Sequence, residues 1–140
     1  ALILAGIGFW GARPYAPAEN QIEWVEWSPE AMKEALEDEE RPVFVDFTAK
    51  WCATCQMNKK VAYTDEVYAA MEAGNVLLMR ADKTAPNEAI DAEMRKLKRS
   101  SVPVNALYLP GKEPMVTSEL LTPDYLLDFL KQNLPAETEE

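Results

Sequence analysis

Two cysteines, Cys52 and Cys55, are the residues of this chain best suited to chemistry, and the chain has no others. They stand three apart, next to Trp51 and directly after an apolar run of strand length. On a helix, Cβ atoms at i and i+3 lie roughly 5–6 Å apart, and a disulfide tolerates Cα separations of about 4.4–6.8 Å. The unpaired N–H groups and dipole of a helix N-terminus also favour a thiolate there. The pair is therefore predicted to be a redox centre that opens and closes a disulfide.

Other uses of these two thiols fit the sequence less well. A purely structural disulfide between residues three apart removes little chain entropy, because the loop that it closes is very short. Structural zinc usually takes four cysteine or histidine ligands, and this chain has 2 cysteines and no histidine. Two thiolates can hold Cu(I), so a copper-binding module is an alternative of another class, although the 6 methionines are scattered. We predict a site without metal or organic cofactor.

The strand that leads into the cysteines, residues 43–48, is almost entirely apolar and rich in β-formers. Such a run is typical of a central strand that is buried on both faces. Asp46 is the exception in it, and burial should raise the pKa of its carboxyl group. A second interpretation is that neighbouring backbone groups simply satisfy this carboxylate.

The remaining elements follow from apolar runs and from helix caps, which are predicted at Ser28, Thr64, Asn87 and Thr122. The predicted strands are 22–27, 43–48, 76–81, 104–109 and 115–120, and the predicted helices are 28–38, 52–61, 64–72, 88–99 and 122–134. Alternation of strands and helices indicates an α/β fold with a mostly parallel sheet that helices cover on both faces. The last strand is expected to add an antiparallel edge, so the sheet is mixed and has four to five strands.

Composition narrows the range of partners. The chain has 140 residues, which fits one domain, and 48% of them are hydrophobic. Its formal net charge of −10 argues against nucleic-acid binding, which normally needs a basic face. The acidic surplus is most simply a device for solubility, and we expect an isolated domain of this kind to be a monomer.

The first ten residues form a charge-free apolar segment, which is too short to span a bilayer alone. One interpretation is that residues 1–10 are the end of a transmembrane helix, with Trp10 and Arg13 as interfacial anchors. The alternative is an apolar stub packed on the domain. Residues 11–21 are predicted to be a linker, residues 22–134 the folded domain, and residues 135–140 a disordered acidic tail.

Two motifs give the chain a family resemblance. The stretch from Val45 to Cys55 resembles the thioredoxin signature, in which an Asp-containing strand leads to Ala-x-Trp-Cys-x-x-Cys. The stretch from Ser101 to Val104 matches the second hallmark, a loop with a cis-proline before the third core strand. Within the thioredoxin-like superfamily, residues 22–134 most resemble the C-terminal domains of the DsbD family of transmembrane thiol:disulfide interchange proteins.

The resemblance implies a role for each site residue. Cys52 would be the exposed nucleophile and Cys55 the thiol that resolves the mixed disulfide. Asp46 would accept and return the proton of Cys55. Pro103, in the cis form, would hold Val102 beside the disulfide, where its backbone could pair with an incoming peptide.

Trp51 and the two lysines after the cysteines, Lys59 and Lys60, also bear on the site. Trp51 would shape the surface that meets the partner, unless it is simply a core aromatic. Lys59 and Lys60 stand where DsbD-type domains often carry an acid, one turn beyond the second cysteine, and a basic residue there favours the thiolate.

The function implied is a thiol–disulfide oxidoreductase at the periplasmic face of the bacterial inner membrane. It would take electrons from a transmembrane donor domain and pass them to other thiol–disulfide proteins. The alternative within this class is a free-standing thioredoxin-like reductase that serves cytochrome c maturation or disulfide repair. A non-catalytic binding domain is the least consistent possibility, because the cysteine pair is intact.

Overall fold

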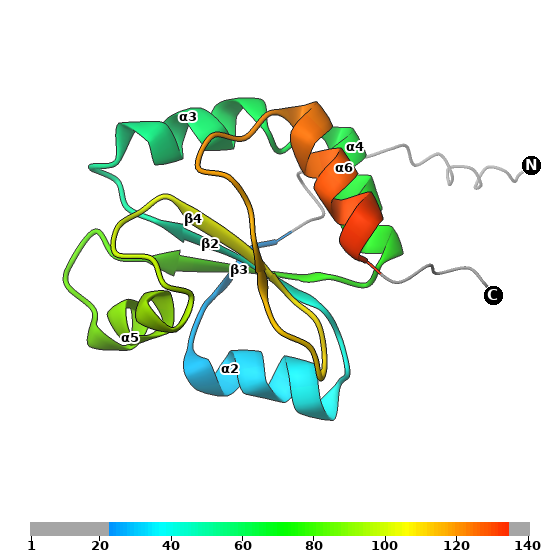
Figure 1. The fold of residues 1–140 in the computed structure, drawn as a ribbon, viewed down its shortest axis with the longest axis horizontal. Coiled ribbons are helices and arrows are strands. Elements are labelled where there is room, and N and C mark those ends of the chain that lie inside the picture. The colour runs from blue at the N-terminus through cyan, green and yellow to red at the C-terminus, as the bar shows by residue number, and fades with distance from the viewer. Residues whose placement is uncertain (1–22, 135–140) are drawn as a thin grey trace, which may run out of the picture.

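The computed structural model of the chain describes residues 23–134, which form a central sheet with helices on both sides (Figure 1). The predicted membrane segment 1–10, the linker 11–21 and the acidic tail 135–140 lie outside the described residues, as does residue 22. Between residues 23 and 134, no helix has the length and apolar character needed to cross a bilayer.

The ten predicted elements are found close to their expected positions, with the predicted helix 28–38 divided into two. In chain order the elements are β1 (Val25–Glu26), α2 (Pro29–Lys33), a π-helical turn η1 (Glu34–Asp38), β2 (Val43–Thr48), α3 (Ala53–Val61), α4 (Asp65–Ala73), β3 (Leu77–Asp82), α5 (Glu88–Lys96), β4 (Val104–Tyr108), β5 (Met115–Val116) and α6 (Pro123–Asn133). The predicted helix 28–38 is thus a short α-helix that continues as a wider turn. The first and last strands are each only two residues long.

The sheet has the order β1-β3-β2-β4-β5. β1 and β2 run parallel to β3, whereas β4 is antiparallel to β2 and β5 is antiparallel to β4. The sheet is mixed, as predicted, but the expectation of a mostly parallel sheet was wrong for β4. The reason is that β3 ends at Asp82 beside Thr48 and β4 begins at Val104 beside Phe47, so the chain returns to the same end of the sheet. The segment containing α5 therefore does not act as a crossover to the opposite end.

All four predicted helix caps are confirmed. The side chains of Ser28, Thr64, Asn87 and Thr122 each accept a hydrogen bond from a backbone N–H three residues later, at 3.0, 3.3, 3.1 and 3.1 Å. These bonds satisfy N–H groups that have no partner within the first helical turn. Local sequence thus determines where the helices around the site begin.

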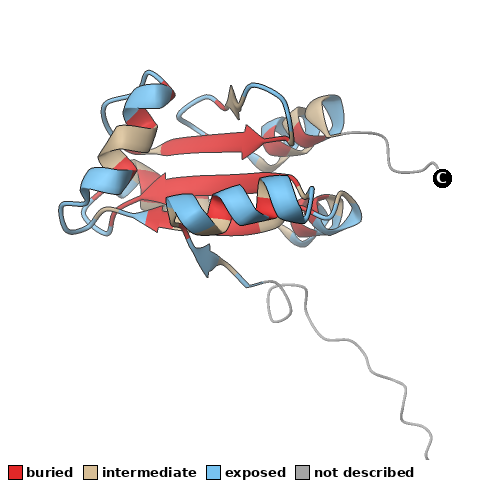
Figure 2. Cartoon of the chain, turned by 90° about the horizontal axis from the view of Figure 1, so that it is seen from below, coloured by how far each residue is buried: buried red, intermediate tan, exposed pale blue. Residues whose placement is uncertain are grey.

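Two apolar cores lie on opposite faces of the sheet. Helices α3, α4 and α6 cover one face, and α2 and α5 cover the other (Figure 1). Figure 2 shows the central strands buried and the helices exposed on their outer sides. Side chains of β2 alternate between the two cores: Val45 and Phe47 belong to the core under α2 and α5, and Phe44 belongs to the core under α4 and α6. Every residue of β2 is buried, as the apolar run predicts.

The last strand is shorter than predicted because the chain leaves the sheet after Thr117. The N–H of Thr117 still donates to Asn105 in β4, but the N–H of Ser118 donates to the Tyr125 hydroxyl instead. The buried side chain of Asn58 in α3 then holds the loop, donating to the Glu119 carbonyl at 2.8 Å and accepting from the Leu121 N–H at 3.1 Å. Side-chain hydrogen bonds have replaced the strand pairing expected for residues 118–120.

We predict that Asn58→Ala destabilises the fold by about 2–4 kcal/mol, because it leaves two backbone groups of this loop without a partner. Urea unfolding of the two proteins measures the change. Lys60→Ala, on the exposed side of the same helix, is the control and should alter stability by less than about 0.5 kcal/mol. Equal effects of the two substitutions would contradict the anchoring role of Asn58.

Candidate redox site

The two cysteines form a disulfide at the start of α3. Their Cα atoms are 5.2 Å apart, within the range that a disulfide spans. Cys52 is the N-cap of α3, and its sulfur accepts a hydrogen bond from the N–H of Cys55 at 3.1 Å. Both residues are buried, and Cys52, which is 8% exposed, is more accessible than Cys55, which is 2% exposed. The helix N-terminus therefore supports negative charge at the more accessible of the two cysteines.

Trp51 lies beside this pair on the surface. Its side chain is 62% exposed, so the interpretation of Trp51 as a core aromatic was wrong. Its indole N–H donates to the carbonyl of Thr84 at 3.2 Å, and the Thr84 hydroxyl accepts from the N–H of Lys50 at 2.8 Å. The Asp82 carboxylate in turn accepts from both the N–H and the hydroxyl of Thr84. The loop after β3 thus fixes the position of an exposed aromatic next to the disulfide.

The peptide bond between Val102 and Pro103 is cis, as the motif predicts. Val102 is buried and belongs to the same apolar cluster as Cys52 and Cys55. Val104, at the start of β4, pairs with Phe47 near the end of β2, so the loop before β4 and the start of the cysteine helix lie at the same end of the sheet.

Asp46 is a buried carboxylate in the middle of the sheet. It is 4% exposed and lies between Arg80 of β3 and Asn105 of β4 in the strand register. By the alternation of β2, its side chain is on the same face as Phe44, which α3, α4 and α6 cover. Its Oδ2 is 3.7 Å from the Nε of Arg80, which is an ion pair but too long for a hydrogen bond. Neither of these two atoms has a hydrogen-bond partner within residues 23–134.

The surroundings of Asp46 shift the pKa of its carboxyl group. Burial raises the pKa of this carboxyl group from 3.8 to about 6, while the positive charges of Arg80 and Lys59 oppose the rise. Lys59 is one turn beyond Cys55 on α3, and burial lowers its own pKa, against the attraction of Asp46. The expectation of a raised pKa for Asp46 agrees with this environment. Satisfaction by neighbouring backbone groups does not describe it, because Oδ2 has no such partner.

Arg80 is the residue that sequence reasoning missed. Its guanidinium carbon is 4.3 Å from the ring centroid of Trp24, so it is held between an aromatic face and the Asp46 carboxylate. The signal was available, because Arg80 is a charge inside the predicted buried strand 76–81, as Asp46 is inside 43–48. Two opposite charges in adjacent buried strands indicate an ion pair.

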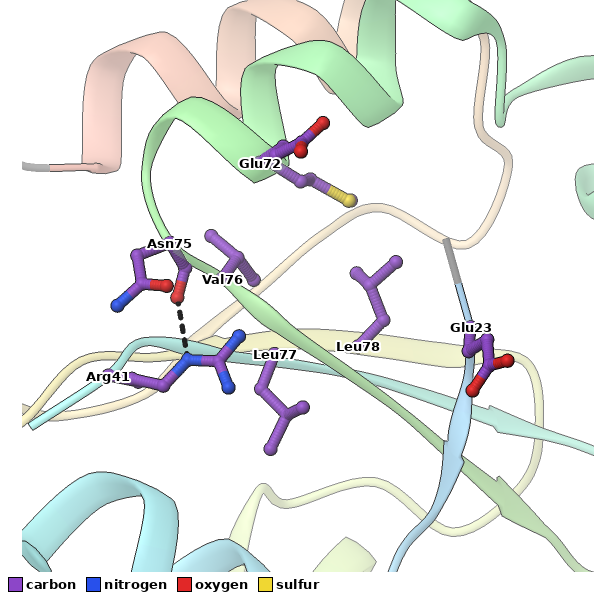
Figure 3. Close-up of a pocket in the computed structure, with 8 residues that line it drawn as sticks. Glu23, Arg41, Glu72, Asn75, Val76, Leu77 and Leu78 are labelled. Atoms are coloured by element: carbon purple, nitrogen blue, oxygen red, sulfur yellow. Dashed lines mark hydrogen bonds between the residues drawn. The ribbon is translucent and has the colours of Figure 1, made fainter. Parts of the chain in front are cut away.

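A pocket at the other end of the sheet is separate from this site (Figure 3). It has a volume of about 180 Å³, and its lining includes Arg41, Asn75 and Leu77, where the Arg41 Nε donates to the Asn75 carbonyl at 3.1 Å. Leu77 pairs with Val43, at the start of β2, whereas the disulfide follows the end of β2. Across residues 23–134, no three Cys, Asp or Glu side chains gather as metal ligands would.

We predict that Asp46→Asn stabilises the protein at pH 8 and not at pH 4. With a folded-state pKa of about 6 against 3.8, the folded protein holds a proton that the unfolded chain has released, so stability falls as pH rises through this interval. The full cost above pH 6 is about 3 kcal/mol, and a neutral side chain avoids it. Urea unfolding at both pH values measures the difference, with Asp128→Asn on the exposed side of α6 as control. Identical pH profiles for Asp46→Asn and the unsubstituted chain would refute this assignment.

We also predict that Lys59→Met raises the pKa of Asp46 above its value of about 6, because a positive charge that favours the carboxylate is lost. The carboxyl ¹³C shift of Asp46 followed by NMR against pH reports this pKa directly. Lys60→Met removes the same charge from the exposed side of α3 and should leave the titration unchanged. A shift of equal size in both variants would show that net charge, and not the position of Lys59, is responsible.

Known proteins resemble this chain both in sequence and in fold. The thiol:disulfide interchange protein DsbD of Campylobacter jejuni strain RM1221 is 26% identical over 99 residues, which are 70% of this chain and 17% of the length of that protein. The same protein from C. jejuni serotype O:2 matches equally well. The chain thus spans about a sixth of the length of these curated relatives.

Two solved structures share the fold. The reduced C-terminal domain of Neisseria meningitidis DsbD superposes with a TM-score of 0.63 at 21% identity, over 74% of this chain and 91% of that domain. The oxidised form superposes with a TM-score of 0.65 at 19% identity, over 78% and 98%. A sequence profile described as thioredoxin-like matches residues 23–110, more than half of the chain. With its Cys-x-x-Cys disulfide at the head of a helix, the chain belongs to the thioredoxin-like family.

Proposed function

We propose that this chain is a thiol–disulfide oxidoreductase that relays electrons from a membrane-embedded donor domain to extracytoplasmic thiol–disulfide proteins. The observation that carries the proposal is the disulfide at the start of α3, at the same end of the sheet as the loop of Val102 and cis-Pro103. The similarity to DsbD, whose name describes thiol:disulfide interchange, supports the same reaction class.

The chemistry consists of two thiol–disulfide exchanges. In the outward step, the thiolate of reduced Cys52 attacks one sulfur of the partner's disulfide, and the other sulfur leaves as a thiolate. The thiolate of Cys55 then attacks the Cys52 sulfur and releases the partner's second thiolate. Two electrons have passed to the partner, and the Cys52–Cys55 disulfide has formed. The donor's dithiol reverses both steps to reduce the chain again.

Asp46 is suited to handle the proton of Cys55. A carboxyl group with a pKa of about 6 is mostly ionised at pH 7, so it can accept the proton, directly or through water, when Cys55 must become a thiolate. The two cations that oppose the rise in its pKa, Arg80 and Lys59, keep it a base at that pH. We assign proton transfer to Asp46 and the resolving attack to Cys55.

The surface around the disulfide can hold an extended peptide. Within residues 23–134, the backbone N–H and carbonyl of Val102 form no hydrogen bond, which leaves both for a partner strand. Trp51, fixed by Thr84, offers an exposed apolar face beside the same sulfur. We assign partner binding to Val102, Pro103 and Trp51.

We place the chain at the periplasmic face of the inner membrane. Its similarity to DsbD supports a periplasmic domain of a membrane protein, and the apolar segment 1–10 is consistent with the end of a membrane helix. A free-standing reductase for cytochrome c maturation or disulfide repair would use the same site. The residues encoded upstream of Ala1 distinguish the two, since only the relay requires several hydrophobic spans before the domain.

Copper binding has less support from the side chains. Of the 6 methionines, Met32, Met71, Met79 and Met94 are buried and divided between the two cores, and Met57 is exposed, so they do not form one group as the thioether ligands of a copper site would. A copper titration with and without prior closure of the disulfide separates a Cu(I) module from a redox protein.

We predict that Cys55→Ser traps the partner covalently, because the mixed disulfide on Cys52 can no longer be resolved. Expression of this variant in bacterial cells and non-reducing electrophoresis should show adducts that a reducing agent dissolves. The double variant Cys52→Ser, Cys55→Ser should form none. Absence of any adduct with Cys55→Ser would contradict the relay.

A further inference from the structure

A concentrated positive charge lies at the end of α5 in this otherwise acidic protein. Four of the five residues 95–99, which read Arg-Lys-Leu-Lys-Arg, are basic, although the chain carries a net charge of −10. Leu97 is buried, so its side chain holds this turn, with its basic neighbours, against the core. Positive charge at a helix C-terminus is favourable, but that effect is limited to the last turn and does not explain basic residues beyond it.

The end of α5 borders a pocket of about 280 Å³, which we call the basic pocket. It is lined by Lys83, Asp91, Met94, Arg95, Arg99 and Ser100. The lining comes from α5 and from the chain segments that border the redox site on two sides. Lys83 directly precedes Thr84, which holds Trp51, and Ser100 is two residues before Val102. The pocket is therefore only one or two residues along the chain from Thr84 and Val102, on the segments that we assign to partner binding.

The cations of the basic pocket differ in whether a carboxylate pairs with them. Lys83 pairs with Asp91 at 2.6 Å, and Arg95 pairs with Glu88 at 3.0 Å. Arg99 has no carboxylate partner within residues 23–134, and its side chain reaches only the Lys98 carbonyl at 3.4 Å. Its backbone is nevertheless fixed, because the Arg99 N–H donates to the Met94 carbonyl at 2.9 Å. An anchored, exposed guanidinium is well suited to a bidentate bond with a carboxylate.

We propose that the basic pocket receives an acidic side chain of the protein that exchanges disulfides with this chain, with Arg99 as the main contact. This inference rests on the proposed function and adds a rule for partner choice: the partner carries Asp or Glu a few residues from its reactive cysteine. The negative charge of the rest of the surface makes the rule selective, because an acidic partner is repelled elsewhere and attracted only here.

Two synthetic peptides test the rule. Each has one cysteine blocked as a neutral 2-pyridyl disulfide. In one peptide, Glu residues flank the cysteine, and in the other Gln replaces every Glu. Attack by reduced Cys52 releases 2-thiopyridone, whose absorbance gives the rate, and Cys55 then frees the peptide thiol while the protein disulfide closes. The reduced 140-residue chain should react about tenfold faster with the Glu peptide at low salt, and the preference should shrink as salt is added.

Three variants locate the effect. Arg99→Gln should reduce the preference for the Glu peptide to about onefold while leaving the rate with the Gln peptide unchanged, which also shows that the variant is folded. Arg99→Lys should retain part of the preference, since the charge remains but the fork is lost. Lys131→Gln removes the same charge from an exposed position on α6, near the end of the sheet where Leu134 approaches Gly74, and should keep the preference in full.

The results separate this inference from the proposed function. Equal rates with both peptides, or a preference that survives Arg99→Gln, would refute the basic pocket and leave the oxidoreductase intact. Failure of the reduced chain to react with either peptide would refute the proposed function and the partner rule together.

Discussion

The complete burial of β2 is the constraint on which the rest of the structure depends. All six of its residues are buried, which requires a strand on each side and a layer of helices on each face. The two cores form on those faces, and the disulfide follows where the strand ends. Because the strand is rigidly held, the start of α3 is held as well, and a reactive sulfur can be presented in a fixed position.

The same burial opposes ionisation of the Asp46 carboxyl group. An ionised carboxylate within the sheet is opposed by desolvation, and the fold compensates with one cation from β3 and one from α3, neither of them hydrogen-bonded to Oδ2. The compensation is incomplete, as the raised pKa shows. An apolar residue here would avoid the cost of desolvation, so the buried carboxylate fits the proton transfer that we propose for Asp46.

Local sequence predicted most of the helices and strands, but not the residues that reach the site from other strands. Capping residues and apolar runs act over a few positions, so the helix starts and the central strands were found where expected. The cis bond before Pro103 was expected from the family resemblance alone. The direction of β4 was wrong because it depends on how far the segment of α5 carries the chain, which no local pattern encodes. The early end of β5 depends on Asn58, which is 61 and 63 residues distant from its partners.

The same distinction holds within the site. The two cysteines stand three residues apart, so a redox pair could be proposed from spacing, whereas the role of Trp51 came from the family resemblance. Arg80 and Thr84 reach the site from β3 and the loop after it. Their positions depend on how β3 pairs with β2, which cannot be read from the sequence. Charges in two separate buried strands would have indicated the first contact, but nothing in a single threonine indicates the second.

Electrostatics connects the buried and exposed parts of the site. Positive charge is placed on the inner side, where Arg80 and Lys59 favour the Asp46 carboxylate, and on the outer side, where the basic run ends α5. Both lie on a protein whose net charge is −10. A thiolate is stabilised by positive neighbours and destabilised by negative ones, so a redox site in such an acidic chain needs local cations to remain reactive. The cations near Asp46 and those at the end of α5 concentrate positive charge locally while the net charge of the chain stays negative.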